Sequence, residues 1–334
     1  MPVSVIIVNY RSAAFICNCI ESAFKFPSAG DMEWVIVDND SKDNSKEVIT
    51  LRFPFVKWID MGYNAGFARA NNRGIRESKF EVVLLLNPDV IVLEDAIAKC
   101  YQKFIKTNYV ACGVQMLNPD HSPQISGSHF AKGGLNHLLP LPYWGAFVKW
   151  IGLNFNIRRT PIERADSEEM VDWISGAFLM VKKEAIAKAG GMDEDFFLYA
   201  EEVEWCSRLR KIGELCIFGD LHVIHLEGSI INTDRQIDEK GYFNLYDRKG
   251  LQLIVSNHLR VRKQYGVFWF LFLLLNYSWA VLVLWIGSTL HRLFTLRNPF
   301  GDWKKAAAFG KNVFTLWTLS PKIIRNKPYF YKMF

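Results

Sequence analysis

Short apolar runs alternate with segments of helical periodicity over the first 115 residues. Each run is four to six residues long and rich in β-branched residues, which is typical of a parallel sheet covered on both faces. The predicted strands are Val3–Val8, Glu33–Val37, Val56–Ile59, Val82–Leu86 and Tyr109–Val114. The predicted helices between them are Ala13–Phe26, Ser45–Leu51, Phe67–Glu77 and Leu93–Lys106. This order predicts a doubly wound α/β unit.

The alternation stops over residues 117–170, which hold five of the 12 prolines. A long irregular stretch inside a compact domain is usually functional. The alternation then returns, and the remaining elements follow the same pattern. They are a strand over Trp173–Val181, helices over Lys183–Ala189 and Tyr199–Lys211, and a last strand carrying His222–His225.

The last part of the chain differs in character. Helical periodicity covers Tyr242–Tyr265, and Val267–Ile286 is an apolar stretch of 20 residues, long enough to span a bilayer or to form a buried core helix. One complete span would export a basic tail, against the positive-inside rule. We therefore expect either a hairpin broken near Asn276 or helices lying in the interface plane.

The chain thus divides into an α/β domain over residues 1–240 and a helical, membrane-associating region over 241–334. Of the net charge of +6, residues 287–334 contribute nine Lys or Arg against one Asp, so the rest of the chain carries a net charge of −2. A basic tail beside an apolar stretch favours membrane lipid, bound through residues 267–334, and no nucleic-acid partner is expected. The six cysteines are scattered without a CxxC pair, which favours a reducing compartment. We expect the cytoplasmic face of a cell membrane.

Polar clusters follow three of the predicted strands. In open α/β sheets, ligands bind beyond the carboxyl ends of the strands. A single cluster is explained by a turn, whereas three acidic or amide clusters on one rim indicate a site for a hard cation and a diphosphate. The clusters are Asn9-Tyr10, Asp38-Asn39-Asp40 and Asn87-Pro88-Asp89.

Two further segments could belong to this site. Asn64-Ala65-Gly66-Phe67 precedes a helix, and Gly66 either lets the backbone approach a ligand or forms the turn that starts the helix. His225 ends a short apolar strand and is either structural or a metal ligand beside Asp89.

The segment Tyr199–Arg208 carries adjacent carboxylates. Glu204 and Arg208 are four residues apart and can pair on one helix face. Glu201 and Glu202 point in different directions, so one can be structural while the other faces a cleft as a general base. The alternative is a solvated acidic helix start, favoured by the helix dipole.

Together these segments resemble family 2 glycosyltransferases, specifically the bacterial rhamnosyltransferase-like branch, which implies that the membrane is a bacterial cell membrane. Seven motifs match in family order over residues 3–230: VSVIIVNYRS, VIVDNDSKDNS, NAGFARANNRG, LLLNPDV, VDWISGAFLMVKKEA, GGMDEDFFLYAEEVEWCSRLRKIG and VIHLEGS. The resemblance implies a GT-A fold, a nucleotide-sugar-binding α/β fold with a mostly parallel sheet. It also implies inverting transfer of a sugar, most simply rhamnose, from dTDP-rhamnose or a UDP-hexose. The acceptor would be a lipid-linked or other oligosaccharide in cell-surface polysaccharide synthesis, and residues 117–170 would help to bind it.

The resemblance also implies roles for individual residues. Glu202 takes the position of the catalytic base, with Glu201 beside it. The family has a Glu-Asp pair at these two positions, whereas this chain has Glu-Glu. A divalent cation, Mg²⁺ or Mn²⁺, would bind Asp89 and His225. The donor–acceptor junction would comprise Trp173, Ser175, Gly176 and Ala177. The donor-binding residues would be Asn9, Tyr10, Asp38, Asp40, Asn64, Gly66, Asn72, Asn87 and Asp89.

Two other functions fit parts of the sequence. VIVDND ends in Asp-x-Asp, as in haloacid-dehalogenase-like phosphatases, but Lys42 stands where a small hydroxyl residue is expected. A non-catalytic, membrane-tethered protein that binds nucleotide sugars is the other alternative, and the acid retained at Glu202 argues for activity instead.

Overall fold

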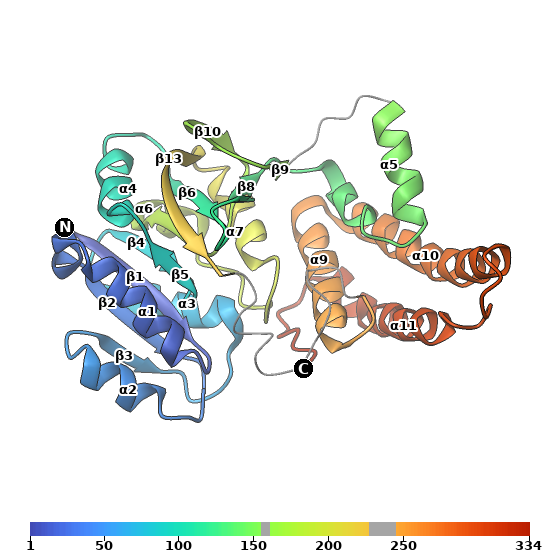
Figure 1. Cartoon of the computed structure of the whole chain (residues 1–334), viewed down its shortest axis with the longest axis horizontal. Coiled ribbons are helices and arrows are strands. Elements are labelled where there is room, and N and C mark those ends of the chain that lie inside the picture. Colours follow the sequence, from blue (N-terminus) through green and yellow to red (C-terminus); the bar gives the residue numbers. More distant parts are fainter. Residues whose placement is uncertain (155–160, 227–244) are drawn as a thin grey trace. The chain divides into compact units, whose positions relative to one another are not determined.

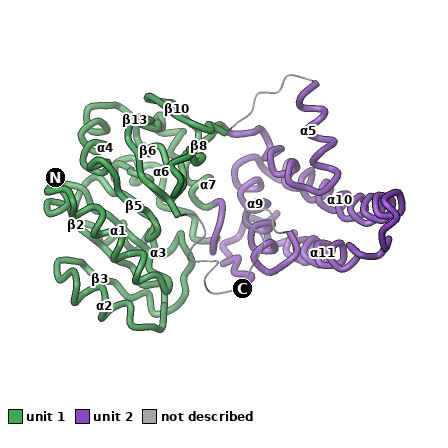
Figure 2. The backbone as a smooth tube through the Cα atoms, in the orientation of Figure 1, with its two compact units in different colours: residues 1–129, 161–194, 201–237 green, residues 130–160, 195–200, 238–334 purple. Residues whose placement is uncertain are grey.

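The computed structural model describes residues 1–154, 161–226 and 245–334 (Figure 1). They form two compact units, shown in Figure 2. Unit 1 comprises residues 1–129, 161–194 and 201–237, and unit 2 comprises 130–160, 195–200 and 238–334. The predicted domain boundary at 240–241 lies outside the described residues. Unit 2 also includes two internal segments that the sequence-based division did not separate.

Unit 1 is built on a mixed sheet. Among the described residues its strand order is β10-β13-β6-β12-β4-β1-β2-β3, with β5 beside β13 and β7 beside β6. The strands are β1 (Val3–Asn9), β2 (Glu33–Asp38), β3 (Lys57–Asp60), β4 (Val82–Leu86), β5 (Val90–Val92), β6 (Ala111–Leu117), β7 (Pro123–Gln124), β10 (Glu168–Val171), β12 (Phe178–Lys182) and β13 (Leu215–His225). A small second sheet has the order β11-β8-β9, formed by Trp173–Ile174, Gly127–Ser128 and Pro161–Ile162.

Helices cover both faces of the large sheet. Successive residues of β1 point to opposite faces, so that Val5 and Ile7 join one core and Ile6 joins the other. The first core contains side chains of α1 (Ala13–Phe24), α2 (Ser45–Arg52) and α4 (Ala96–Phe104). The second contains side chains of α3 (Gly66–Glu77), α6 (Lys183–Ala189) and α7 (Glu201–Leu209). A short 3₁₀ helix, η1, covers Pro27–Asp31. The predicted α/β fold class is confirmed.

Strand direction places the polar rim. β1, β2, β3 and β4 are mutually parallel, as are β6 and β13, so their carboxyl ends meet at common edges. β12 is antiparallel to β4 and β6. The single strand predicted over Trp173–Val181 was wrong, because residues 175–177 turn between β11 and β12. This turn lies where β4 ends, since Asn87 N donates to Ala177 O at 3.0 Å.

Unit 2 is helical. Within its described residues it contains the 3₁₀ helix η2 (Lys132–Leu138) and the helices α5 (Trp144–Asn154), α9 (Arg248–Tyr265), α10 (Val267–Phe294) and α11 (Trp303–Arg325). Asp247 caps α9 by accepting a hydrogen bond from Gly250 N at 2.7 Å. The helices α9, α10 and α11 share one apolar core, to which η2 contributes.

The hairpin expected near Asn276 does not occur. α10 continues through this position for 28 residues. The Asn276 side chain satisfies its polar atoms locally, because Nδ2 donates to Phe272 O at 2.8 Å and Oδ1 accepts from Trp144 Nε1 at 3.0 Å. An asparagine whose amide is bonded in this way need not interrupt a helix.

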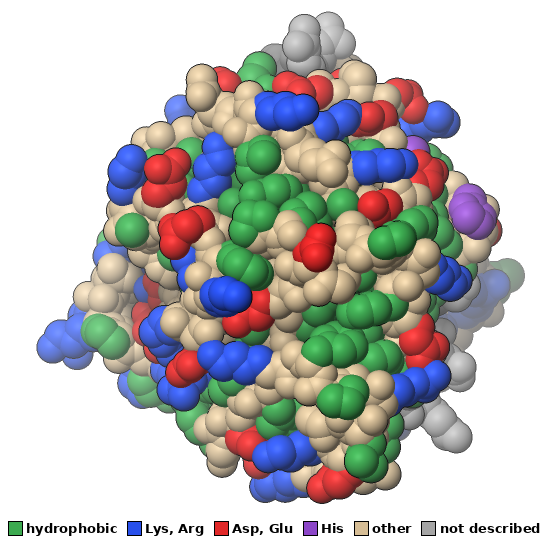
Figure 3. All heavy atoms as spheres, turned by 90° about the vertical axis from the view of Figure 1, so that its left-hand side faces the viewer, with side chains coloured by type: hydrophobic (Ala, Val, Ile, Leu, Met, Phe, Trp, Pro, Cys, Tyr) green, Lys and Arg blue, Asp and Glu red, His purple; other side chains and the backbone are tan. Residues whose placement is uncertain are grey.

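Charges of both signs occur together on the surface. On the face drawn in Figure 3, Lys and Arg side chains are interspersed with Asp and Glu. This mixture agrees with the near-zero net charge of residues 1–286.

Candidate active site

Asn9, the last residue of β1, ties the first two strand ends together. It is fully buried, and its Nδ2 donates to Asp38 Oδ1 at 2.7 Å and to Ser41 Oγ at 3.0 Å. Its Oδ1 accepts hydrogen bonds from the backbone N and the Oγ of Ser12 at 3.1 and 2.9 Å. Ser41 Oγ also donates to Asp38 Oδ1 at 2.5 Å. A network satisfied in this way holds the Asp38 carboxylate in one orientation.

Asn39 joins the end of β2 to the start of α3. Its Oδ1 accepts from Ala65 N at 2.8 Å, and its Nδ2 donates to Asn64 Oδ1 at 3.1 Å. Asn64 Oδ1 also accepts from Gly66 N at 3.2 Å. Gly66 has a φ of 73°, in the left-handed region that glycine adopts without strain. These bonds bring Asn64 and Gly66 next to the loop that carries Asp38.

The other two residues of this rim are more accessible. Tyr10 is 38% exposed, and the Arg11 guanidinium lies 5.5 Å from its ring centroid. Asp40 is half-buried and pairs with Lys42 Nζ at 3.3 Å. An exposed aromatic ring and a nearby carboxylate suit the stacking of a base and the binding of a sugar hydroxyl.

Asp89 and His225 meet at the next strand end. His225 Nε2 lies 3.4 Å from Asp89 Oδ1, and both side chains are more than nine-tenths buried. Gln124 Oε1 lies 2.8 Å from His225 Nδ1, and Gln124 Nε2 donates to Asn118 Oδ1 at 3.2 Å. Because Oε1 can only accept, Nδ1 donates to it, and Nε2 is the ring nitrogen that faces the Asp89 carboxylate. Asn87 Nδ2 also lies 3.4 Å from Nε2.

An imidazole nitrogen and a carboxylate oxygen that face each other in a buried position are ligand types that fit a divalent cation. A partner on Nδ1 that sets the tautomer is the usual second-shell arrangement of a metal-binding histidine. No group of three or more His, Cys, Asp or Glu with metal-binding geometry occurs among the described residues. Mg²⁺ commonly takes one or two protein ligands and completes its coordination with substrate phosphates and water.

Two adjacent carboxyl groups open α7 and differ in environment. Glu201 is 3% exposed, and its Oε2 has no hydrogen-bond partner among the described residues. Burial, and secondarily the charge of Glu202, raise the pKa of Glu201 well above its usual range. Glu202 is half-buried and lies beside Gly176, where an added methyl group would meet Glu202 Cβ at 3.6 Å. Glu202 is therefore the member of the pair that a substrate can reach.

The donor–acceptor junction predicted at residues 173–177 forms the turn after β11. Ser175 N donates to Ser126 O at 2.9 Å, and Ala177 N donates to Ser175 Oγ at 3.3 Å. Trp173 is half-buried on β11. The turn thus lies at the end of β4, and its Gly176 lies against Glu202.

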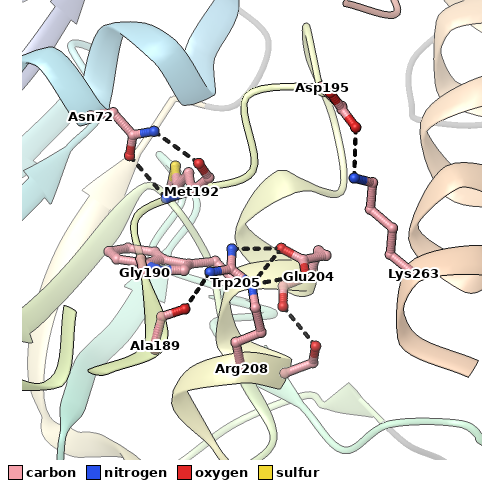
Figure 4. Close-up of polar contacts among 10 residues, drawn as sticks. Asn72, Ala189, Gly190, Met192, Asp195, Glu204, Trp205, Arg208 and Lys263 are labelled. Atoms are coloured by element: carbon pink, nitrogen blue, oxygen red, sulfur yellow. Dashed lines mark hydrogen bonds and ion pairs between the residues drawn. The ribbon is translucent and has the colours of Figure 1, made fainter. Parts of the chain in front are cut away.

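The residues before and within α7 are held by side-chain clamps (Figure 4). Asn72 bonds both backbone groups of Met192, with Nδ2 donating to O at 2.8 Å and Oδ1 accepting from N at 2.9 Å. Trp205 Nε1 donates to Gly190 O at 2.8 Å. The predicted pair forms, since Arg208 Nη2 lies 2.7 Å from Glu204 Oε2. Asn72 therefore supports the loop that leads toward α7.

The family model for "Glycosyl transferase family 2" matches residues 4–172. The chain belongs to glycosyl transferase family 2. The predicted family is thereby confirmed.

Curated relatives of this family 2 glycosyltransferase match between about half and two thirds of the chain. The low-salt glycan biosynthesis hexosyltransferase Agl10 of Haloferax volcanii is 30% identical over 66% of this chain and 66% of its own length. The rhamnosyltransferase WbbL of Escherichia coli is 25% identical over 67% of this chain and 83% of its own length. The N-acetylglucosaminyl-diphospho-decaprenol L-rhamnosyltransferase of Mycobacterium tuberculosis is 28% identical over 55% of this chain and 62% of its own length. The matches to the first and third relatives thus span just under two thirds of their lengths.

Solved structures show the same fold. The mannosyltransferase PcManGT of Pyrobaculum calidifontis, in complex with GDP-Man and Mn²⁺, has a TM-score of 0.54 and 14% identity, and the match covers 96% of this chain and 87% of that chain. The structure of GalNAc-T7 with UDP, GalNAc and Mn²⁺ has a TM-score of 0.50 and 16% identity, over 81% of this chain and 56% of that chain. These likenesses confirm the predicted GT-A fold.

Two residues of the candidate site were not predicted from the sequence. Ser41 completes the Asn9–Asp38 network and is buried. Its sequence signal was its place directly after Asp38-Asn39-Asp40. Gln124 orients His225 across 101 residues of chain. It lies in the irregular segment 117–170, where no periodicity or motif marked it.

The environment of Glu201 predicts a pH effect on stability. A carboxyl group whose pKa is raised on folding stabilises the protein fully at low pH, and this stabilisation is lost as the pH rises through the folded-state pKa. Glu201→Gln cannot ionise. We therefore expect the melting temperature of this variant, relative to wild type, to rise as the pH increases above the ordinary glutamate pKa of about 4.3. A parallel pH dependence in the two proteins would contradict this expectation, and the exposed Glu169→Gln on β10 is the control.

Proposed function

We propose that this chain is an inverting glycosyltransferase that moves a sugar from a nucleotide-diphosphate donor to an acceptor hydroxyl. The observation that carries the proposal is the approach of the buried Asp89 and His225, with the His225 tautomer set by Gln124. The site lies on the rim that also holds the Asn9–Asp38 network. Family membership makes the nucleotide sugar the expected ligand.

The donor is assigned to the rim. Asn9, Tyr10, Asp38 and Asp40 would line the nucleotide, and Asn64, Gly66, Asn87 and Asp89 would lie along the donor, with Asn72 as their support. Rhamnose is the proposed sugar, given as dTDP-rhamnose, because two of the similar relatives are named as rhamnosyltransferases. A UDP-hexose is the second donor class, and Agl10 is named as a hexosyltransferase.

Asp89 and His225 would hold Mg²⁺ or Mn²⁺. When bound, the cation would neutralise negative charge on the departing diphosphate. Glu202 would accept the proton of the acceptor hydroxyl. At the same time the hydroxyl oxygen would attack the anomeric carbon of the donor sugar, and the bond from that carbon to the diphosphate would break. Burial raises the pKa of Glu201 and favours its neutral form, so Glu202 is the member of the pair to which the role of base is assigned. The turn carrying Trp173, Ser175, Gly176 and Ala177 would border both substrates.

The phosphatase alternative has no support in the geometry. A nucleophilic aspartate must be open to substrate, whereas Asp38 Oδ1 accepts from both Asn9 and Ser41. Transfer activity of wild type that is lost in Glu202→Gln would distinguish the enzyme from the non-catalytic alternative.

Calorimetric titration tests the donor site. Wild-type protein would be titrated with dTDP-rhamnose, UDP-glucose, UDP-galactose and GDP-mannose, with and without Mg²⁺ or Mn²⁺. We expect metal-dependent binding of one donor. Failure of every donor to bind in the presence of either metal would contradict the proposal.

We propose that unit 2 docks on the cytoplasmic face of a membrane, where a lipid-linked saccharide acceptor would lie. Within the described residues, α10 is the helix long and apolar enough to cross a membrane, and one third of its most apolar window is buried. Its outward side chains are largely exposed and apolar. They are Phe268, Phe272, Leu275, Trp279, Leu282, Trp285, Ile286, Leu290, Leu293 and Phe294. We name this set, together with Phe147, Trp150 and Leu153 of α5, the apolar surface.

The packing of α10 favours an orientation in the interface plane. Its other side packs in one core with α9 and α11, and α11 carries exposed Lys304, Lys305 and Lys311. A spanning α10 would draw such charges toward the hydrocarbon, at a cost of about 2.5 to 3.5 kcal/mol for each charge at the bilayer centre.

Trp144 links α5 to α10 through Asn276 and through an edge-on contact with Trp279. α5 would therefore enter the same leaflet.

Substitutions in the apolar surface test this docking. We expect Leu275→Ser/Trp279→Ser/Leu282→Ser to reduce binding to anionic vesicles by about 100-fold or more, since each buried side chain of this size contributes about 1.5 to 3 kcal/mol. Co-sedimentation with the vesicles measures the effect. The control replaces three exposed apolar side chains of unit 1, in Leu51→Ser/Phe55→Ser/Ile212→Ser. Equal sedimentation of the two variants would contradict docking through α10.

A further inference from the structure

The six residues that precede α7 belong to the helical unit. Residues 195–200 cluster with unit 2, whereas α7 belongs to unit 1. The chain runs directly from Ala200 into Glu201 and Glu202. Whatever holds residues 195–200 therefore acts on the first turn of the helix that carries the proposed base.

Asp195 is the first anchor of this segment. Its Oδ2 lies 2.7 Å from Lys263 Nζ of α9, and the two side chains are 13% and 11% exposed (Figure 4). Its Oδ1 accepts from Tyr329 N at 2.9 Å, and its backbone O accepts from Tyr331 N at 2.9 Å. One aspartate thus joins α9 and the C-terminal segment that follows α11.

The C-terminal segment runs beside residues 195–200. Tyr331 forms a parallel β-bridge with Phe196, and both are almost fully buried. The ring of Phe197 makes edge-on contacts with Phe330 and Phe334, at centroid distances of 5.7 and 5.5 Å. These contacts remove large aromatic side chains from water and stabilise the alignment of the two segments.

α9 holds both segments through buried polar side chains. Gln252 is fully buried; its Nε2 donates to Tyr331 O at 3.0 Å, and its Oε1 accepts from Met333 N at 2.9 Å. Ser256 Oγ donates to Leu198 O at 2.7 Å. A buried polar group left without its hydrogen bond costs about 1 to 3 kcal/mol. Displacement of either segment relative to α9 would break these bonds and is therefore unfavourable.

The anchored segment ends in strained backbone. Tyr199 and Ala200 have φ values of 71° and 66°, in the left-handed region, although neither is glycine. Each such residue costs about 1 to 2 kcal/mol. Strain of this kind persists only where the surrounding structure determines the conformation, and it occurs often at functional sites. Here it lies immediately before Glu201.

We propose that residues 327–334, with α9, form a clamp that fixes the first turn of α7 and thereby positions the carboxylate of Glu202. The inference rests on the proposed role of Glu202 as the base. Tyr331, Asp195 and Lys263 are positioning residues, because they act through the backbone that leads into α7. A displacement of about 1 Å at a reacting group can lower the rate about 100-fold.

Removal of residues 327–334 from the otherwise full chain tests the clamp. We expect kcat to fall about 100-fold, while the dissociation constant of the donor, measured by calorimetry, changes less than about 3-fold. Hydrogen exchange of the amides of residues 196–205 should become faster. The control is Lys327→Ala, which alters an exposed side chain of the same segment.

A second pair of variants guards against a failure of the truncated chain to fold. Lys263→Met removes the cation beside the buried Asp195 carboxylate, and we expect it to lower kcat with little change in donor binding. Lys263→Met/Asp195→Asn removes the buried charge and keeps an acceptor for Tyr329 N. We expect the double variant to recover most of kcat. If the charges of Lys263 and Asp195 acted directly in the reaction, kcat would stay low.

The outcomes separate the clamp from the proposed function. Unchanged kcat in both the truncated chain and Lys263→Met would overturn the clamp. If wild type transfers no sugar, the proposed function fails, and hydrogen exchange alone judges the clamp. Faster exchange at residues 201–205 in the truncated chain would then support it, and unchanged exchange would overturn it.

Discussion

Glu202→Gln should lose transferase activity almost completely, with kcat lower by about 1,000-fold. Glutamine keeps the size of the side chain and its place beside Gly176, but it cannot accept the proton of the acceptor hydroxyl. Because Glu202 is assigned to the acceptor side, the dissociation constant of the donor should stay close to that of wild type. Initial rates and calorimetric titration of the same preparation measure the two quantities.

Two further substitutions sharpen this test. Glu202→Asp keeps a carboxylate one methylene shorter, as in the family's Glu-Asp pair, and should retain more activity than Glu202→Gln. Glu169→Gln, at an exposed position on β10, should leave the rate unchanged. Full activity of Glu202→Gln would exclude this residue as the base. Absence of activity in wild type, despite donor binding, would favour the non-catalytic alternative.

Asp89→Asn should weaken metal-dependent donor binding by more than about 10- to 100-fold, because loss of even an outer-shell partner of a metal ligand has an effect of that size. The asparagine matches the carboxylate in shape but carries no charge to attract a cation beside His225. The effect should disappear when the titration is done without divalent cation. The measurement is the calorimetric titration described above, repeated with Mg²⁺ and with Mn²⁺.

The matched control for Asp89 is Asp220→Asn. Asp220 is a partly exposed carboxylate of β13 that pairs with Lys103, and its loss should not affect donor binding. Gln124→Leu should weaken metal-dependent binding less than Asp89→Asn, because it removes the partner of His225 Nδ1 and leaves both ligands in place. Equal, metal-dependent affinity of wild type and Asp89→Asn would exclude Asp89 as a cation ligand.

The proposed clamp would give unit 2 a role beyond the proposed docking on a membrane. The α9 helix that holds residues 195–200 shares a core with α10, which presents the apolar surface. If both proposals hold, the unit that docks on lipid also orders the backbone before Glu202. The vesicle experiment and the truncation test these roles separately, because the apolar surface and residues 327–334 share no residue.

Sequence alone determined the features that depend on local pattern. β4 and α6 begin and end where periodicity predicted, because a buried strand and an amphipathic helix each carry their signal within a few consecutive residues. The polar clusters after β1, β2 and β4 were predicted to share one rim, since parallel strands place their carboxyl ends together. The motifs identified the family for the same reason, because each is a short run of adjacent residues.

Only the tertiary structure decided what distant residues do together. It brought Gln124 to His225, turned the chain at Gly176 toward Glu202, and laid Tyr331 beside Phe196. None of these contacts leaves a local pattern, because each depends on how complete elements pack and on which buried polar group finds which partner. Asn276 shows the same limit: its position predicted a break, but a hydrogen bond from Trp144, 132 residues earlier, satisfies its side chain within a continuous helix.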